Sequence, residues 1–477
     1  MIIGKPLPFI SAFVESVDEA IRQHSPHHGL SALQRTWLAF CLTAVLMTNS
    51  ICWARFARAS LGTYSLAALS WMFRHSKIPW DELLVASVRL ILRHYGLSCG
   101  SLIIDDTDNK RSKAAKTLAH LYKLRDKDSG GYVWGQSLVF LVLVTPHITL
   151  PVGFAFYQPA PELSAWYKQD KILKKHGVPK KQRRSKPPAN PHYPTKHDLA
   201  LRLLHQFQAH HPAWPVSCLT ADALSGMAPF VDTASALGGG VQIISQIRSN
   251  QKVRVPKREQ PGADSCAAHP GTPHAIRIRG GARVVALVSS ARLSVCSHKT
   301  KRLVGAIKDE GEETSRSLMA SDLTWRTRDM VQGHTLRWLV EVFIQDWKSY
   351  AGWSPWTKQP GEEGARRSVR LSLRVDHRLF FPPDHPAQLK NTLPAYTGGS
   401  RRAHVQVESL VGVMEHLLSS EAPQSQLQRF THTLHEVFAF GRSKKHMIQR
   451  QLERLEPTPS LKYRADEVMR NIPALST

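Results

Sequence analysis

The stretch Leu102-Ile-Ile-Asp-Asp-Thr107 decides where the character of this chain changes, because a short apolar run ends there in two adjacent carboxylates. Before it, apolar residues recur at helical spacing with Arg and His between them, which predicts an all-helical domain over residues 1–96. After it, two prolines divide residues 137–157 into two short β-rich runs that read as core strands. The sequence therefore predicts an α/β domain over residues 97–370.

Further strands and a helix follow within this domain. Residues 216–220 form a strand candidate that ends near Asp222, and residues 241–247 form another. Residues from about 250 to 320 alternate β-like runs with Gly and polar residues. We expect a β-rich insert there, before a helix over residues 328–350.

Two basic segments lie within and after the α/β domain. Residues 159–194 are rich in Lys, Arg and Pro, which predicts a long basic loop. Thr195 is followed three residues later by Asp198, a capping pair that predicts the start of a helix. Residues 371–477 are expected to form a basic helical C-terminal region, with exposed helices over residues 406–418 and 426–455.

Composition limits the partners of this 477-residue chain. It has 63 Lys and Arg against 37 Asp and Glu, a formal net charge of +26 and a pI near 10.1. With 42% hydrophobic and 8% aromatic residues, the chain has enough apolar material for folded cores, which excludes wholesale disorder. So large a positive charge predicts binding to a polyanion, with nucleic acid ahead of an acidic membrane surface.

The cysteines and the apolar runs indicate the compartment. Six cysteines are scattered without any C-x-x-C pair, so neither a zinc module nor a disulfide framework is predicted, and a reducing cytoplasm fits best. The N-terminus has no signal-peptide pattern. Residues 37–54 are free of charge over the lower length limit of a membrane span, but they contain Thr, Asn and Ser. We interpret them as a buried helix rather than a span.

Acidic residues stand where strands end or where a helix faces inward. They are Asp105 and Asp106 after the first strand, Asp222 after a second, and Glu341 within the helix over residues 328–350. Carboxylates that converge from separate elements are what two divalent cations need, because Mg²⁺ prefers oxygen ligands. Taken singly, each of these residues is as readily a strand-end cap or a solvated charge.

The helix that carries Glu341 separates its side chains by chemistry. At about 100° per residue, His334, Arg337, Glu341 and Lys348 share one narrow stripe. The apolar residues of the helix fall on the opposite side and would pack on the sheet; they are Leu336, Leu339, Val340, Phe343 and Trp347. Simple i,i+4 helix pairs would also explain the cations. The functional reading is that Glu341 binds metal while the cations hold DNA phosphates.

Three motifs give a specific resemblance. Ile104-Asp-Asp-Thr, Thr220-Ala-Asp-Ala and Arg337-Trp-Leu-Val-Glu-Val-Phe-Ile-Gln-Asp-Trp-Lys are similar to the catalytic motifs of bacterial insertion-sequence transposases of the Asp-Asp-Glu (DDE) class. The resemblance is to the cut-and-paste group whose helix carries a Tyr, Arg, Glu, Lys signature. Arg337, Glu341 and Lys348 match with the right gaps, whereas His334 stands at the Tyr position.

The resemblance covers residues from about 101 to 352, and it implies a fold for the chain and roles for the residues of the motifs. It implies a ribonuclease-H-like catalytic domain with a β-rich insert, preceded by an all-helical DNA-binding domain and followed by a helical tail. The resemblance assigns catalysis and metal binding to Asp106, Asp222 and Glu341. These residues would bind two Mg²⁺ ions, for which Mn²⁺ can substitute. Contact with DNA phosphates falls to His334, Arg337 and Lys348. Trp325 would stack on a flipped base if a hairpin forms, although an aromatic residue of the core is the simpler reading.

The implied function is a transposase that binds the terminal inverted repeats of an insertion sequence, cleaves the ends and joins the 3′-hydroxyls to target DNA. A homodimer assembled on the double-stranded DNA ends is implied, and no membrane is involved. The alternative is a domesticated, non-cleaving DNA-binding protein on the same fold. Binding of the ends would fall mainly to the helical domain, where positive charge comes from Arg55, Arg58, Arg74 and His75.

The two adjacent aspartates cannot both face the metals, because successive side chains of a strand point to opposite sides. The apolar pattern does not choose between them, since a central strand of an α/β sheet is apolar on both faces. The resemblance favours Asp106, which stands directly before Thr107, and leaves Asp105 to brace the strand end.

Overall fold

The computed structural model describes residues 6–60, 63–111, 117–126, 129–248, 251–255, 258–262, 271–278, 282–309, 315–353 and 359–381, with scattered positions between 407 and 431. The helices expected inside residues 406–455 lie mostly outside the described residues, as does most of the region 371–477.

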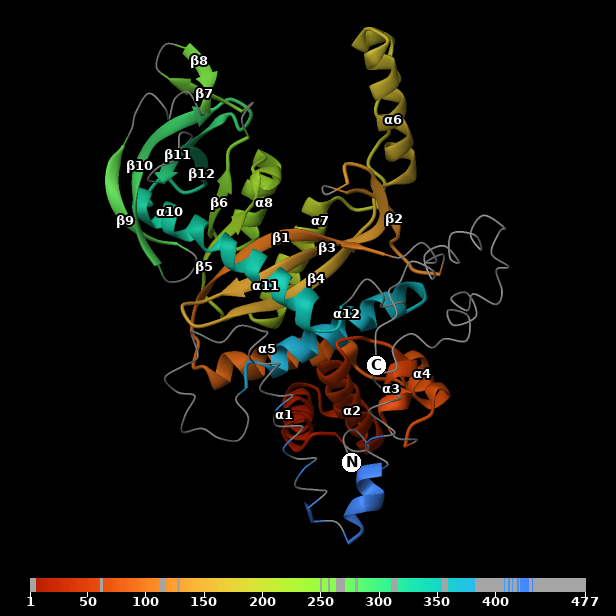
Figure 1. Cartoon of the computed structure of the whole chain (residues 1–477). Helices are drawn as coiled ribbons and strands as arrows, with labels where there is room; N and C mark the ends of the chain where they lie inside the picture. The colour runs from red at the N-terminus through yellow and green to blue at the C-terminus, as the bar shows by residue number, and fades with distance from the viewer. Residues whose placement is uncertain are drawn as a thin grey trace, which may run out of the picture.

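One mixed β-sheet runs through the molecule (Figure 1). Its described strands are β1 (Gly100–Lys110), β2 (Tyr122–Arg125), β3 (Tyr132–Val144), β4 (Thr149–Tyr157), β5 (Val216–Ala221), β6 (Gln242–Gln246), β7 (Lys252–Val255), β8 (Arg258–Pro261), β9 (Thr272–Ile278), β10 (Ala282–Val295), β11 (Thr300–Asp309) and β12 (Arg316–Ala320). Their order is β2-β3-β1-β5-β6-β12-β11-β10-β7-β8, with β4 beside β3 and β9 beside β10.

The directions of the strands divide the sheet into two parts. β3 is antiparallel to β1 and to β4, whereas β5 and β6 run parallel to β1. The strands of the expected insert, β7 to β12, continue the same sheet, because β12 pairs antiparallel with β6. The result is a mixed α/β fold with a large mixed sheet, which is consistent with the ribonuclease-H-like domain implied by the motifs.

Helices cover both faces of the central strands. On one face lie α1 (Pro8–His24), α2 (Ala32–Thr48), α3 (Trp53–Ala59), α4 (Leu66–His75), the first turns of α5 (Trp80–His94), α11 (Arg337–Tyr350) and α12 (Gly361–Arg378), which share one core with Ile103 and Phe140. On the other face lie α7 (Lys196–His210) and α8 (Ala228–Leu237), which share a second core with Ile104 and Leu141. The N-terminal helices therefore form part of the same packed body as the sheet.

Several local predictions are confirmed. The two core strands expected within residues 137–157 are β3 and β4, and the strands expected at 216–220 and 241–247 are β5 and β6. Thr195 caps α7, because its side chain accepts from the Asp198 N–H and the Asp198 side chain accepts from the Thr195 N–H. These elements were readable because alternation and capping are local properties of the chain.

Three local predictions are wrong. The expected basic loop contains a 15-residue helix, α6 (Pro161–Lys175). The single helix expected over residues 328–350 is divided at Leu336 into α10 (Thr327–Thr335) and α11. The boundary expected at residue 370 falls inside α12, because that helix packs on α2, α4 and α5.

The charge-free residues 37–54 form parts of α2 and α3, and all ten residues from Trp37 to Leu46 are buried. No single described helix is long and apolar enough to cross a membrane, and α2 with α3 reaches that composition only as a pair bent by 94°.

The core face of α11 generates a stability prediction. Phe343 is 6% exposed and packs edge-on against Phe140, with 5.6 Å between the ring centroids. We expect Phe343→Ala to lower the free energy of unfolding by about 3–5 kcal/mol, through lost burial and the cavity left behind. The neighbouring Val342 is 41% exposed, so Val342→Ala should change it by less than about 0.5 kcal/mol. Urea unfolding followed by circular dichroism measures both, and equal losses would contradict the assignment of this face.

Candidate functional site

The register of β1 against β5 brings two aspartates to the same edge of the sheet. Ile103 pairs with Thr220 and Ile104 with Ala221, in parallel. The next residues are Asp105 and Asp222, which extend the same register on the face covered by α10 and α11. Their proximity is electrostatic as well as geometric, because the negative charge of Asp222 raises the pKa of Asp105.

A single guanidinium connects β1 to the helix that carries Glu341. Arg337 Nη1 donates to Asp105 Oδ2 at 2.9 Å, and Arg337 Nη2 donates to Glu341 Oε1 at 2.5 Å. The pairs are partly shielded from water, since the Arg337 side chain is 23% exposed and that of Asp105 13%. Asp105 and Glu341 therefore face one shared cation.

Asp106 points to the opposite face of the sheet. Its Oδ2 accepts from Lys196 Nζ at 2.6 Å, and Lys196 is the first residue of α7. In this structure Asp105, and not Asp106, faces the Glu341 helix, while the catalytic role expected for Asp106 stays a prediction. The reason is the alternation of the strand: Ile103 and Asp105 share the α11 face, while Ile104 and Asp106 share the α7 face.

The environment of Asp105 opposes its ionisation. Burial raises the pKa of Asp105 from 3.8 to about 6, against the lowering effect of Arg337 and of the Asp106 N–H that donates to Oδ1 at 2.9 Å. The negative charges of Asp106 and Asp222 raise the pKa further. A carboxylate held between negative neighbours in a partly buried position is where an additional cation would be stabilised.

Asp222 is held by the turn that follows β5. Its Oδ1 accepts from both the N–H and the hydroxyl of Ser225 at 3.2 Å, as the cap of a short 3₁₀ turn. Its carbonyl accepts from the Ser245 hydroxyl at 2.7 Å, which fixes the turn to β6. The side chain is therefore oriented before any ligand arrives.

The two other predicted DNA contacts behave differently. Lys348 lies on α11, as expected, and its Nζ donates to the Asp108 carbonyl of β1 at 2.5 Å; burial lowers its pKa. His334 belongs to α10, beyond the break at Leu336, and is only 5% exposed. Burial, with the charges of Arg337 and Arg316, lowers the pKa of His334 to about 4. His334 thus lies close enough to Arg337 to feel its charge, but it is buried, and its expected contact with DNA stays a prediction.

The donors suit a hard divalent cation in kind. Asp105, Asp222 and Glu341 offer carboxylate oxygens, and Arg337 already stands as one cation between two of them. Among the residues that the structure describes, no three acidic, His or Cys side chains are grouped closely enough to hold a metal ion. The arrangement thus provides the ligand chemistry, with the guanidinium in competition for the same oxygens.

The residues expected to bind DNA ends lie elsewhere. Arg58, Arg74 and His75 are exposed on α3 and α4, which Figure 1 shows far from the insert strands; Arg55 is half-buried. Trp325 is partly buried against the core of the insert strands, which supports the core reading rather than base stacking.

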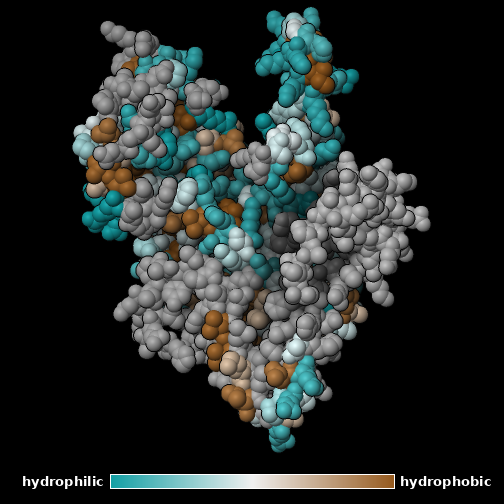
Figure 2. All heavy atoms as spheres, viewed as in Figure 1, coloured by the Kyte–Doolittle hydropathy of each residue, from teal (hydrophilic) through white to brown (hydrophobic). Residues whose placement is uncertain are grey.

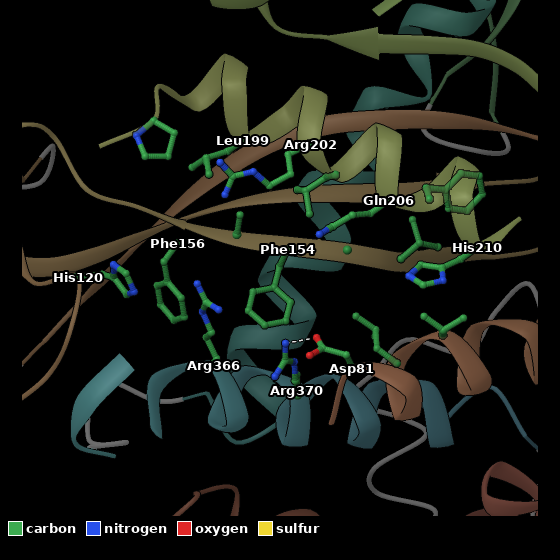
Figure 3. Close-up of a pocket in the computed structure, with 18 of the residues that line it drawn as sticks. Asp81, His120, Phe154, Phe156, Leu199, Arg202, Gln206, His210, Arg366 and Arg370 are labelled. Atoms are coloured by element: carbon green, nitrogen blue, oxygen red, sulfur yellow. Dashed lines mark hydrogen bonds and ion pairs between the residues drawn. The ribbon is translucent and has the colours of Figure 1, made fainter. Parts of the chain in front are cut away.

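One cavity is separate from the carboxylates. It has a volume of about 680 Å³ and lies around β4, between α5, α7 and α12. Figure 3 shows Arg202 of α7 on one side of β4 and Arg366 of α12 on the other, with Phe154 beside Arg366. Asp105, Asp222 and Glu341 do not line it, so catalysis at the carboxylates cannot use it.

Lys196 is the residue that the sequence alone did not single out. It follows the capping residue Thr195, and nothing in its local pattern marks it as a partner of Asp106, which is 90 positions away. Only the packing of α7 on the sheet brings the pair together.

The family model described as DDE superfamily endonuclease matches residues 27–294, which is more than half of the chain. The match contains Asp105, Asp106 and Asp222 and ends before Glu341. None of the curated proteins matches this chain.

Among solved structures, the chain is similar to the NurA nuclease from Sulfolobus solfataricus over 50% of this chain and 73% of that one, with 9% identity and a TM-score of 0.19. That likeness is too weak to inform the fold or the function. The family match is sufficient by itself: the chain belongs to the DDE superfamily endonucleases.

Proposed function

We propose that this protein cleaves DNA phosphodiester bonds and that its active site contains Asp105, Asp222 and Glu341. The observation that carries the proposal is that Arg337 joins Asp105 to Glu341, and the β1–β5 register supports the position of Asp222 beside Asp105. The family implies a divalent metal ion, and Mg²⁺ fits oxygen donors of this kind. When bound, such ions activate the attacking water and stabilise the leaving oxygen.

Arg337 would change partners during this reaction. While it pairs with Asp105 and Glu341, its positive charge offsets the repulsion between the two carboxylates in the folded protein. If Asp105 and Glu341 held a metal ion, the guanidinium would be free to donate to a DNA phosphate, for which its planar fork is well suited. Lys348, at the other end of α11, would hold a second phosphate.

The finer proposal is a transposase with a ribonuclease-H-like domain that binds terminal inverted repeats as a dimer and joins the cut 3′-hydroxyls to target DNA. It rests on the three motifs and on the net charge of +26. A non-cleaving DNA-binding protein would be favoured if a carboxylate of the set were missing, and all three are present.

Purified protein incubated with DNA that carries the ends flanking its own gene, with Mg²⁺ and then with EDTA, tests the function. We expect nicks at the ends in Mg²⁺ only, and joining to a plasmid target. Ends that stay intact in Mg²⁺ and Mn²⁺, while still being bound, would support the non-cleaving alternative.

The assignment of Asp105 generates the first activity prediction. Asp105→Asn, Asp222→Asn and Glu341→Gln should each lower the cleavage rate by at least about 100-fold, because each removes an oxygen donor from the site. Asp106→Asn is the matched control, one residue away on the other face, and should keep the rate within about tenfold. A gel assay of cleavage with circular dichroism as the folding check measures this. The reverse ranking of the two β1 variants would return the role to Asp106.

The exchange of partners by Arg337 generates the second. Arg337→Gln should bind Mg²⁺ about fivefold more tightly, since roughly 1 kcal/mol of competing charge is removed, and should lose about one unit of the log–log salt slope of DNA binding. Lys348→Gln should lose the same slope without a change in Mg²⁺ affinity, because its partner is a backbone carbonyl. Calorimetry and fluorescence anisotropy distinguish the two. Unchanged Mg²⁺ affinity in Arg337→Gln would rule out the competition.

The third prediction follows from the raised pKa of Asp105 and concerns unfolding experiments in EDTA. Because the folded-state pKa of about 6 lies above the ordinary 3.8, the protonated form stabilises the fold fully below about pH 4, and this stabilisation is lost as the pH rises through about 6. At about 1.4 kcal/mol per pKa unit, the ionised carboxyl costs roughly 3 kcal/mol. Asp105→Asn should therefore gain more unfolding free energy at pH 8 than at pH 5. Equal gains at both pH values would contradict the raised pKa.

A further inference from the structure

Residues 161–186, here called the basic arm, project from the body of the molecule. Figure 1 shows α6 standing clear of the sheet and of the other helices, and none of its residues is buried. Figure 2 shows mostly hydrophilic side chains on this projection. A helix that buries nothing contributes little to the stability of the fold, so its form calls for another explanation.

The basic arm holds its shape through its own contacts. Trp166 Nε1 donates to the Arg184 carbonyl at 2.9 Å, and Arg183 pairs with Asp170 at 2.9 Å. Lys186 lies over the Tyr167 ring, 5.9 Å from its centroid. Seven prolines between residues 159 and 194 restrict the backbone further. The return segment is thereby fixed against α6.

Its charge is concentrated and one-sided. The arm contains nine Lys and Arg against Glu162 and Asp170, a net charge of +7. At about 100° per residue, four exposed lysines of α6 fall within an arc of about 120°, away from Trp166. They are Lys168, Lys171, Lys174 and Lys175. A stripe of this kind matches the evenly spaced phosphates of a nucleic acid backbone.

The arm leaves the sheet at the end where the carboxylates lie. β4 and β5 both run in the direction of β1, so the arm after β4 and Asp222 after β5 emerge at the same edge. Tyr157 of β4 and Asp108 of β1 both pair with Ser137 of β3, so they lie at the same level of the sheet, two strands apart. Asp108 is three residues beyond Asp105. Tyr157 is therefore offset from Asp105 by roughly 10 Å along the strand and roughly 10 Å across the sheet.

The base of the arm is fastened beside the site. Lys196, where the chain returns, pairs with Asp106 at 2.6 Å and lies 5.3 Å from the ring centroid of Tyr157, where the chain departs. Asp106 is the next residue after Asp105 in the chain. The residues that flank the arm are thus held next to β1, on the face opposite to Asp105.

We propose that the basic arm binds the phosphate backbone of the DNA duplex that flanks the strand cleaved at Asp105, Asp222 and Glu341. This rests on the proposed function and adds a second grip to it. The 15 residues of α6 span roughly 22 Å, the rise of about six base pairs, so the arm contacts phosphates several base pairs from the cut. Its contacts read no bases and are independent of sequence.

The test is binding to a fluorescent 40-base-pair duplex of arbitrary sequence, in EDTA, over a range of NaCl concentrations. The variant carries Lys168→Gln, Lys171→Gln, Lys174→Gln and Lys175→Gln. We expect its affinity at 150 mM NaCl to fall by at least about tenfold and its log–log salt slope to flatten by about two to four. The matched control removes four exposed cations of the insert strands, Lys252→Gln, Arg283→Gln, Lys299→Gln and Lys301→Gln, and should change both much less.

The outcomes separate the arm from the chemistry. An unchanged slope in the arm variant, or an equal loss in the control variant, overturns the inference. If wild-type protein cleaves DNA and the arm variant binds normally, the arm inference fails while the proposed function stands. If no DNA is cleaved but the arm variant binds weakly, the proposed function fails and the arm remains a DNA-binding element. A second variant with a short Gly-Ser linker in place of residues 161–186 should reproduce the loss.

Discussion

The alternation of side chains along β1 is the constraint on which the rest of the site depends. Asp105 goes to the face of α11, where it meets Arg337, and Asp106 goes to the face of α7, where it meets Lys196. One peptide bond therefore connects the candidate chemistry to the base of the basic arm. Neither aspartate could exchange roles without a one-residue shift of the strand, which would move Ile103 and Ile104 to the wrong cores.

Burial and charge act against each other at Asp105. Removal from water disfavours its ionised form, and the positive charge of Arg337 offsets part of that effect. The guanidinium is a good internal counter-ion because it is always charged and forms two directed bonds, one to each carboxylate. A site that is electrostatically strained without its ligand gains most when cations bind, which is a common property of catalytic centres.

The shared core places the N-terminal helices in a supporting role. α1 to α4 pack in the same core as α11, and α12 also packs against α2, α4 and α11. The exposed cations of α3 and α4 lie far from the basic arm in Figure 1. DNA that reached both surfaces would have to follow the long dimension of the molecule.

The sequence by itself determined the features that depend on local periodicity: the strands β3 to β6, the cap of α7, the β-rich run after residue 250 and the apolar face of α11. It also indicated Asp222 and Glu341, since each follows or interrupts a recognisable pattern. The tertiary structure placed Asp105 beside α11 and Asp106 beside α7, because the alternation of a strand acquires meaning only when neighbouring elements cover each face. It also buried His334, because elements distant in the sequence pack over α10, which a helical wheel cannot represent. Finally, it turned a basic segment into a projecting helix, because contacts such as Trp166 with Arg184 form only when the chain folds back on itself.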